Sequence, residues 1–176
     1  YNIRQGFGAS NRFDLEAVAR ELEQHLAEIV ALQEVGRGWV ISGAADSLAW
    51  LSKRLDMPAY FGANAGDLWG NAVLTSLPVE KVQNTHFNLK GRVPRGFQTL
   101  NLEGLGTSVT IINTHLDHED DGTPTRASQV VRILESWNQG PRTLLVGDMN
   151  AEAGTAVIRT LDKAGYSDSN PDGPMT

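Results

Sequence analysis

The chain contains no cysteine, so it has neither disulfide bonds nor thiolate metal ligands. It also lacks any apolar run near the roughly 20 residues that cross a bilayer, and its longer runs, such as Ile29–Leu32, have the length of a strand. Basic residues are in deficit: 15 Lys and Arg stand against 21 Asp and Glu, and they form no dense run. The net charge of −6 disfavours long-range attraction of nucleic acid, which would need a local basic patch.

The composition itself is that of a globular protein. With 176 residues, of which 40% are hydrophobic and 20% charged, the chain is expected to form one domain over residues 1–176. No signal peptide is recognisable, and the cellular compartment stays open.

Hydrophobic periodicity predicts an alternation of helices and short strands. Helices are predicted around Leu15–Leu26 (capped by Asp14 or Asn11), Ser47–Leu55, Thr125–Trp137 and Thr155–Ala164. Strands are predicted at Tyr1–Arg4, Ile29–Leu32, Tyr60–Ala63, Asn71–Thr75, Lys81–Leu89, Phe97–Leu102, Ser108–Asn113 and Thr143–Val146.

The connections between these elements indicate the fold class. The glycine-rich segment Glu103–Thr107 suits a β-hairpin, and the acidic segment Asp117–Pro124 is expected to be an exposed loop. Hairpins in the middle of the chain favour antiparallel or mixed sheets with helices on their outer faces. We therefore expect an α/β protein, a four-layer sandwich of two mixed, mostly antiparallel sheets, in preference to a doubly wound parallel sheet.

Polar residues follow several predicted strands, where a strand by itself does not need them. They are Asn2, Gln33-Glu34, Thr114-His115, and Asp148 with Asn150. Each has an ordinary reading: a lone Glu is more often a surface residue or a cap, Gly-Asp-x-Asn is more often a turn, and a lone His is often structural. Because strand ends can meet at one rim of a sheet, their joint occurrence predicts a functional site there.

The residue types suit a hard cation and a phosphate ester. Mg²⁺ prefers carboxylate and carbonyl oxygens and keeps several waters, so Glu34 is a candidate ligand with Asn2 as a neutral helper. Hydrolysis also needs a base and a positioned water, for which Asp148 and Asn150 are candidates.

Cationic and hydrogen-bonding side chains complete the candidate site. His115 and His118 can donate hydrogen bonds to charge that develops on a phosphate. Arg95 can pair with phosphate oxygens through its planar guanidinium.

Five short motifs occur in an order that resembles the endonuclease/exonuclease/phosphatase superfamily, with its DNase I-like fold, over nearly the whole chain. The motifs are Tyr1-Asn2-Ile3-Arg4, Leu32-Gln33-Glu34-Val35, Gly70-Asn71-Ala72-Val73-Leu74, Asn113-Thr114-His115-Leu116-Asp117 and Gly147-Asp148-Met149-Asn150-Ala151. The resemblance implies a four-layer sandwich and a Mg²⁺-dependent hydrolase whose metal-binding Glu is Glu34, with Asn2 close to the metal.

The resemblance also assigns the other positions to the reacting groups. It implies Asp148 and Asn150 around the attacking water, His115 and His118 on the scissile phosphate, and Asn71 and Arg95 nearby as further substrate-binding residues. Arg126 and Gln129 are expected to order the acidic loop.

The resemblance further implies C-terminal strands that carry an Asp and a terminal Ser-Asp-His signature, which these residues do not contain. We expect the chain to be part of a longer protein; a truncated product and a partner chain that donates the missing strands are the alternatives. A sheet edge left open in this way would favour homodimers.

The sequence therefore predicts a Mg²⁺-dependent phosphohydrolase, with Mn²⁺ as an alternative metal. The expected substrate is a small or lipid phosphodiester, and nucleic acid is disfavoured by the acidic charge. The competing hypothesis is a catalytically incomplete superfamily member that acts as a binding or dimerisation module. Trp69, next to Gly70-Asn71, is a candidate for stacking on a substrate.

Overall fold

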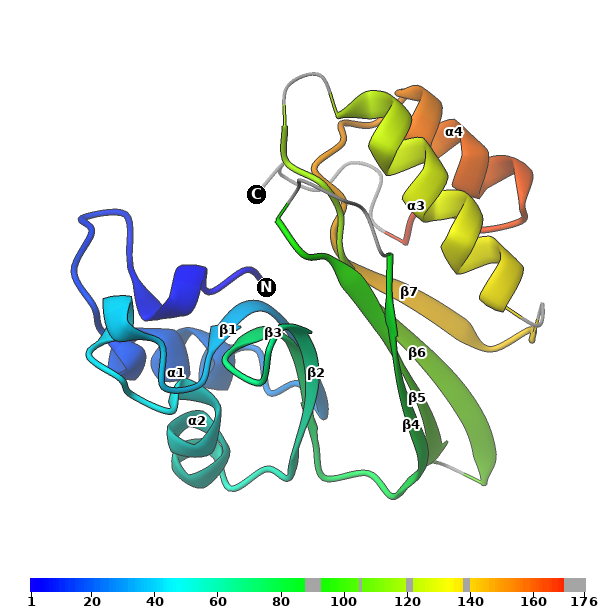
Figure 1. Cartoon of the computed structure of the whole chain (residues 1–176). Coiled ribbons are helices and arrows are strands. Elements are labelled where there is room, and N and C mark those ends of the chain that lie inside the picture. The colour runs from blue at the N-terminus through cyan, green and yellow to red at the C-terminus, as the bar shows by residue number, and fades with distance from the viewer. Residues whose placement is uncertain (88–92, 105, 120–121, 138–139, 170–176) are drawn as a thin grey trace.

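The computed structural model describes residues 1–87, 93–104, 106–119, 122–137 and 140–169, and it contains two β-sheets with helices on their outer faces (Figure 1). The first sheet is antiparallel, with the order β1 (Ile29–Gly36), β3 (Trp69–Thr75) and β2 (Ala59–Ala65). Its central strand β3 is buried along its whole length. Small and apolar residues therefore dominate β3, as expected for a strand covered on both faces.

The second sheet has the order β4 (Val79–His86), β5 (Gly96–Gly104), β6 (Thr107–His115) and β7 (Thr143–Asp148). Antiparallel pairing of Gly104 with Thr107 confirms the predicted hairpin. Among the described strands of this sheet, only β6 and β7 pair in parallel, because α3 (Thr123–Ser136) crosses between them. Both strands of this pair therefore end at the same edge of the sheet.

The remaining helices are α1 (Leu15–Gln24), α2 (Ser47–Leu55) and α4 (Ala156–Lys163), with short 3₁₀ turns at Arg4–Gly6 and Val40–Ser42. Asp14 caps α1 by accepting a hydrogen bond from the Ala17 amide, so of the two predicted caps it is Asp14 that acts. No helix among the described residues is long and apolar enough to cross a membrane.

Three apolar clusters lie between the layers. One joins α1 and α2 to the first sheet, a second lies between the two sheets, and a third joins the second sheet to α3 and α4. This order of helix, sheet, sheet and helix confirms the predicted four-layer α/β sandwich (Figure 1). A polar tie also links the sheets: Asn113 of β6 donates to the carbonyls of Leu32 and Ala72 and accepts from Gln33.

Several predicted boundaries were wrong. Residues 1–4 are not a strand, because Asn2 makes only an isolated bridge to Gln33 and both Arg4 and Gln5 have positive φ. Strand β1 continues to Gly36, so Gln33-Glu34 lie within it, and β6 likewise includes Thr114-His115.

The acidic loop is less exposed than predicted. Asp117 is only 3% exposed; its amide donates to the side chain of Gln129, and its carboxylate accepts from the Glu119 amide. Helix α3 begins at Thr123, inside the predicted loop. Strand β4 ends at His86, and Leu89, the predicted end, lies outside the described residues.

Candidate functional site

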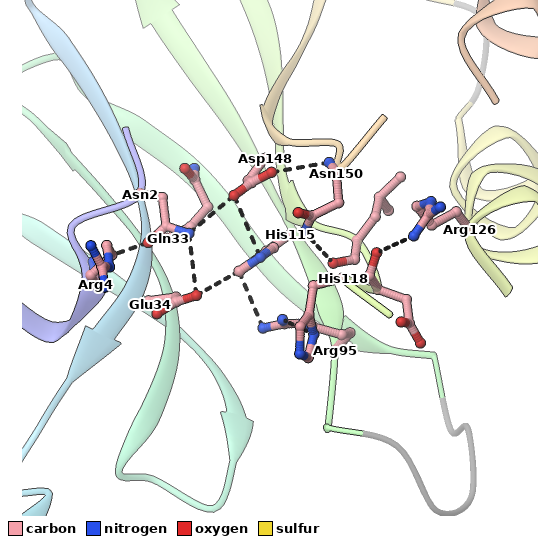
Figure 2. Close-up of polar contacts among 12 residues, drawn as sticks. Asn2, Arg4, Gln33, Glu34, Arg95, His115, His118, Arg126, Asp148 and Asn150 are labelled. Carbon is pink, nitrogen blue, oxygen red and sulfur yellow. Dashed lines mark hydrogen bonds and ion pairs between the residues drawn. The ribbon is translucent and has the colours of Figure 1, made fainter. Parts of the chain in front are cut away.

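Side chains from distant parts of the chain meet at one end of the sandwich (Figure 2). Asn2 Nδ2 donates to Glu34 Oε1 at 3.2 Å and to Asp148 Oδ2 at 3.0 Å. His115 lies against both carboxylates, with its Nε2 3.6 Å from Asp148 Oδ2 and its Nδ1 4.0 Å from Glu34 Oε1. The structure thus brings together Asn2, Glu34, His115 and Asp148, as the sequence predicted.

A bulge in β1 positions Glu34. The register with β3 passes from Leu32↔Ala72 directly to Val35↔Gly70, which leaves Gln33 and Glu34 outside the regular ladder. Glu34 takes a φ of 56°, a left-handed conformation that an L-residue adopts only at an energetic cost. The extra residue turns the Glu34 carboxylate toward Asn2 and His115 instead of into the sheet.

Asp148 ends β7, immediately after Gly147. A Cβ on Gly147 would lie 2.0 Å from the carbonyl oxygen of Thr114, so only glycine allows β7 to approach β6 so closely. The backbone amide of Asn150 donates to Asp148 Oδ1 at 3.0 Å, and Asn150 Nδ2 donates to the carbonyl of Leu116 at 3.0 Å. These bonds fix Asp148 against the turn that follows β7.

The surroundings of Asp148 keep it ionised. Burial alone would raise the pKa of Asp148. The hydrogen bond from Asn2, the nearby His115 and the Asn150 amide outweigh burial, so the pKa of Asp148 lies below its usual value. Asp148 is therefore a carboxylate at neutral pH.

His115 is buried and neutral. Arg95 Nη1 donates to His115 Nδ1 at 3.2 Å, which requires an unprotonated Nδ1 and leaves the ring proton on Nε2, facing Asp148. Burial, together with the Arg95 charge, lowers the pKa of His115 to about 4. The contact between His115 and Asp148 is therefore one of a neutral imidazole with a carboxylate.

Arg95 reaches both histidines. Its Nη2 donates to His118 Nδ1 at 3.2 Å, and its guanidinium carbon lies 5.1 Å from the ring centre of Trp69. Burial lowers the pKa of Arg95 although Glu34, Asp117 and Asp148 act in the opposite direction. Trp69 is buried, with Arg95 over its ring, so it supports the arginine and is not open for the predicted stacking on a substrate.

Asn71 lies beneath this network and not within it. It is 1% exposed, and its Nδ2 donates at 3.3 Å to the carbonyl of Gly96, the residue after Arg95. His118, by contrast, is exposed at the rim. Arg126 donates to the carbonyls of Asp117 and Glu119, so with Gln129 it orders the acidic loop as predicted.

Sequence reasoning gave one residue near the site a wrong role and passed over another. Trp69 was expected to face a ligand, whereas it holds Arg95. Asn64 was not singled out, although it lies in a second bulge beside β3. Asparagine disfavours strands, so its position in a run of small and apolar residues was the available signal.

The oxygen donors suit a cation that keeps most of its water. Within the described part of the chain, no three His, Cys, Asp or Glu side chains form a group that could hold a metal ion. The Glu34 side chain is partly exposed, and the Asp148 carboxylate lies close to it, joined through hydrogen bonds that Asn2 Nδ2 donates to both carboxylates. A Mg²⁺ site needs only one or two carboxylates besides water, so these residues fit that ion.

The comparisons with known proteins agree with this architecture. The sequence profile described as "Endonuclease/Exonuclease/phosphatase family" matches residues 1–176. Truncated TDP2 from Caenorhabditis elegans superposes with a TM-score of 0.63 at 27% identity, covering 79% of this chain and 56% of that one. No curated protein matches the chain by sequence.

Two further solved structures share the fold at lower identity. The human Nocturnin catalytic domain has a TM-score of 0.74 at 20% identity and covers 94% of this chain and 67% of that one. ANGEL2, described as a 2′,3′-cyclic phosphatase, has a TM-score of 0.70 at 17% identity and covers 89% and 49%. The chain thus spans less than two thirds of the length of the TDP2 structure and about half of ANGEL2.

Proposed function

Since the chain belongs to the Endonuclease/Exonuclease/phosphatase family, we propose that it hydrolyses phosphate esters with the help of a divalent cation, Mg²⁺. The observation that carries this proposal is the meeting of Glu34, Asn2, Asp148 and His115 at one end of the sandwich, with Arg95 beside them (Figure 2). Two carboxylates, a neutral histidine and a buried arginine are the groups that water activation and phosphate binding require.

The cation would be held by Glu34, with Asn2 as a neutral neighbour. Asn2 Oδ1 now accepts from the Arg4 amide, and Asn2 Nδ2 lies between Glu34 and Asp148. Asn2 therefore keeps the two carboxylates close together without a charge of its own. A bound Mg²⁺ would offset the negative charge of the phosphoryl oxygens. Mn²⁺ has similar ligand preferences and is the expected substitute.

Asp148 is the proposed base. The hydrogen bonds that Asp148 accepts from Asn2 and from the backbone amide of Asn150 favour its ionised form, so it can accept a hydrogen bond from a water molecule at neutral pH. The backbone amide of Asn150 donates to Asp148 Oδ1 and so fixes the orientation of the Asp148 carboxylate. Asn150 thereby assists catalysis by holding the base in place as the water is aligned.

Arg95 and the histidines form the proposed phosphate site. Arg95 has two Nη groups directed at His115 and His118, and both histidine contacts can be exchanged for phosphate oxygens. His118 is exposed at the rim and is suited to contact an incoming ester. Asn71 contributes through Gly96, next to Arg95.

The proposed substrate is a small or lipid phosphodiester. The net charge of −6 opposes long-range attraction of nucleic acid, and one buried arginine at the site does not make a basic track. A nucleic-acid substrate remains the second choice and would show as a steep dependence of binding on salt concentration.

Hydrolysis of bis-p-nitrophenyl phosphate tests the proposal. We expect turnover with Mg²⁺, loss of turnover on chelation by EDTA, and a loss of at least about 100-fold in Glu34→Ala and Asp148→Ala. Glu80→Ala changes an exposed carboxylate of β4 and is the matched control, expected to retain turnover. Undiminished turnover in Glu34→Ala would contradict the metal role of Glu34.

The same assay, together with a titration with inorganic phosphate, tests the competing hypothesis. A folded chain that binds inorganic phosphate but shows no metal-dependent turnover would contradict the enzymatic proposal and favour a binding module.

A further inference from the structure

Both strands that flank β3 carry a bulge at the same level of the sheet. In β1 the bulge lies between Leu32 and Val35 and directs Glu34 into the site. In β2 the register passes from Ala63↔Gly70 to Ala65↔Trp69, which leaves Asn64 as the extra residue. Bulges commonly redirect side chains beside active sites. The second bulge therefore raises the question of what Asn64 does.

Asn64 is buried without satisfying its polar atoms. Asn64 is 7% exposed, and neither its Oδ1 nor its Nδ2 has a hydrogen-bond partner among the described residues. Asn71 Oδ1, on the neighbouring strand, is in the same condition. A buried amide without partners is unfavourable, and an apolar side chain of equal size would avoid that cost.

These amides surround the backbone that carries Arg95. A Cβ on Gly96 would lie 2.6 Å from Asn64 Oδ1, so Asn64 packs directly against Gly96. The Gly96 carbonyl accepts hydrogen bonds from Asn71 at 3.3 Å and from Thr114 at 3.1 Å.

Arg95 itself has a buried donor without a partner. Its Nε is buried and has no partner among the described residues, whereas its two Nη groups contact His115 and His118. Unpartnered acceptors and donors thus lie around one dipeptide, Arg95-Gly96.

We propose that Asn64 is a positioning residue for Arg95: its amide supplies hydrogen bonds to the Arg95-Gly96 segment when the guanidinium binds an anion. This inference rests on the proposed function, in which Arg95 binds the phosphate. It assigns the bulge of β2 a role parallel to that of β1. One bulge aims the residue that would hold the cation, and the other supports the residue that binds the anion.

Titration with inorganic phosphate, together with KM and kcat for bis-p-nitrophenyl phosphate, tests the role. Asn64→Leu keeps the branched shape and the number of heavy atoms of the side chain and removes the amide. The relief of a buried, unpartnered amide then opposes the cost of two larger methyl groups, so the variant should fold. The dissociation constant for phosphate and the KM should both rise about tenfold, the size of effect seen when supporting residues are removed. Gln98→Met is the matched control, since Gln98 is another buried amide of the inner sheet surface with an unpartnered oxygen. It should leave phosphate binding unchanged.

A double-mutant cycle separates positioning from a general structural effect. Because Asn64 acts through Arg95, Asn64→Leu should cause no further loss in an Arg95→Ala background. An equal loss in both backgrounds, or wild-type phosphate binding by folded Asn64→Leu, would overturn the inference. Should Asn64→Leu fail to fold, Asn64→Ala takes its place in the same cycle.

The proposed function fails separately from this inference. If Arg95→Ala binds phosphate as tightly as the wild type, Arg95 is not the phosphate residue, and the phosphate site of the proposed function is contradicted together with the role of Asn64. If Arg95→Ala weakens binding but Asn64→Leu does not, only the role of Asn64 is contradicted.

Discussion

Glu34 shows at the scale of one residue how this fold trades stability for position. Its φ of 56° is left-handed, and left-handed backbone costs an L-residue about 1–2 kcal/mol. Glycine would relieve that cost but carries no carboxylate. The strained conformation lies in the bulge of β1, where Glu34 faces Asn2 and His115. Backbone strain of this kind is typical of functional sites.

The strain at Glu34 gives a prediction about two substitutions. Glu34→Gly and Glu34→Ala should both abolish metal-dependent turnover, because both remove the carboxylate. Glu34→Gly should be more stable than Glu34→Ala by about 1 kcal/mol, since glycine tolerates positive φ. Urea denaturation of both variants measures the difference, and equal stability would argue against a strained backbone.

Tyr166 gives a prediction about alkaline stability. Burial raises its pKa to about 12, and its ring lies against that of Trp137, with the centroids 4.5 Å apart and the planes tilted by 41°. The folded state thus holds the phenolic proton more tightly than the unfolded state does. This contribution to stability is complete below pH 10 and is lost as the pH rises toward 12.

Tyr166→Phe should therefore remove that part of the pH dependence while keeping the ring contact. The comparison is the free energy of unfolding of the two proteins, measured in urea between pH 8 and pH 12. The wild type should lose stability relative to Tyr166→Phe as the pH rises. A difference that does not vary with pH would refute the assignment.

At the scale of elements, the parallel pair β6–β7 places His115 opposite Asp148. Antiparallel neighbours would bring opposite ends together, so the crossover through α3 is what puts both residues at one edge. Gly147 permits this pairing, because a side chain there would meet the backbone of Thr114.

Gly147→Ala should consequently destabilise the protein by about 3 kcal/mol or more, through backbone collision added to the strain of a φ of 136°. Gly154→Ala is the control: it also has a positive φ, 76°, but nothing within 4 Å of its Cβ, and should cost only about 1 kcal/mol. Denaturation curves of both variants give the comparison. Similar losses would mean that the close approach of β7 to Thr114 carries no cost.

At the scale of the whole molecule, two sheets hold the site between them. Glu34 belongs to the first sheet, whereas His115 and Asp148 belong to the second. The bonds from Asn113 to Leu32 and Ala72, and from Gln33 to Asn113, fix the two sheets near this end. The geometry of the site therefore depends on how the two sheets are positioned relative to each other.

The second sheet also has an open edge among the described residues, formed by β7, on which Leu144 is 52% exposed. An exposed strand edge favours pairing with another chain, so we predict concentration-dependent homodimers through β7. Leu144→Lys should shift the chain to monomers in sedimentation velocity. Val82→Lys, on the opposite edge strand β4, should not, and a wild type that stays monomeric at high concentration would contradict the prediction.

The sequence by itself determined the class of fold and most of the candidate site. Periodicity located the helices, since the apolar faces at Leu15–Gln24 and Ser47–Leu55 are local patterns. The order of short motifs singled out Glu34, His115, Asp148 and Asn2, which the structure brings within contact distances. Both the helical periodicity and the short motifs are patterns among residues close together in the sequence, so they can be recognised without the structure.

Only the tertiary structure decided how those residues face one another. The bulges that expose Glu34 and bury Asn64 depend on which strand lies opposite, and hydrophobic alternation carries no record of that pairing. The same reason explains why Trp69 supports Arg95 instead of facing a ligand, and why Asp117 is buried in a loop that looked exposed. The sequence states which chemical groups each residue carries. Contacts between distant parts of the chain determine where those groups lie and what surrounds them, so the positions could not be predicted from the sequence.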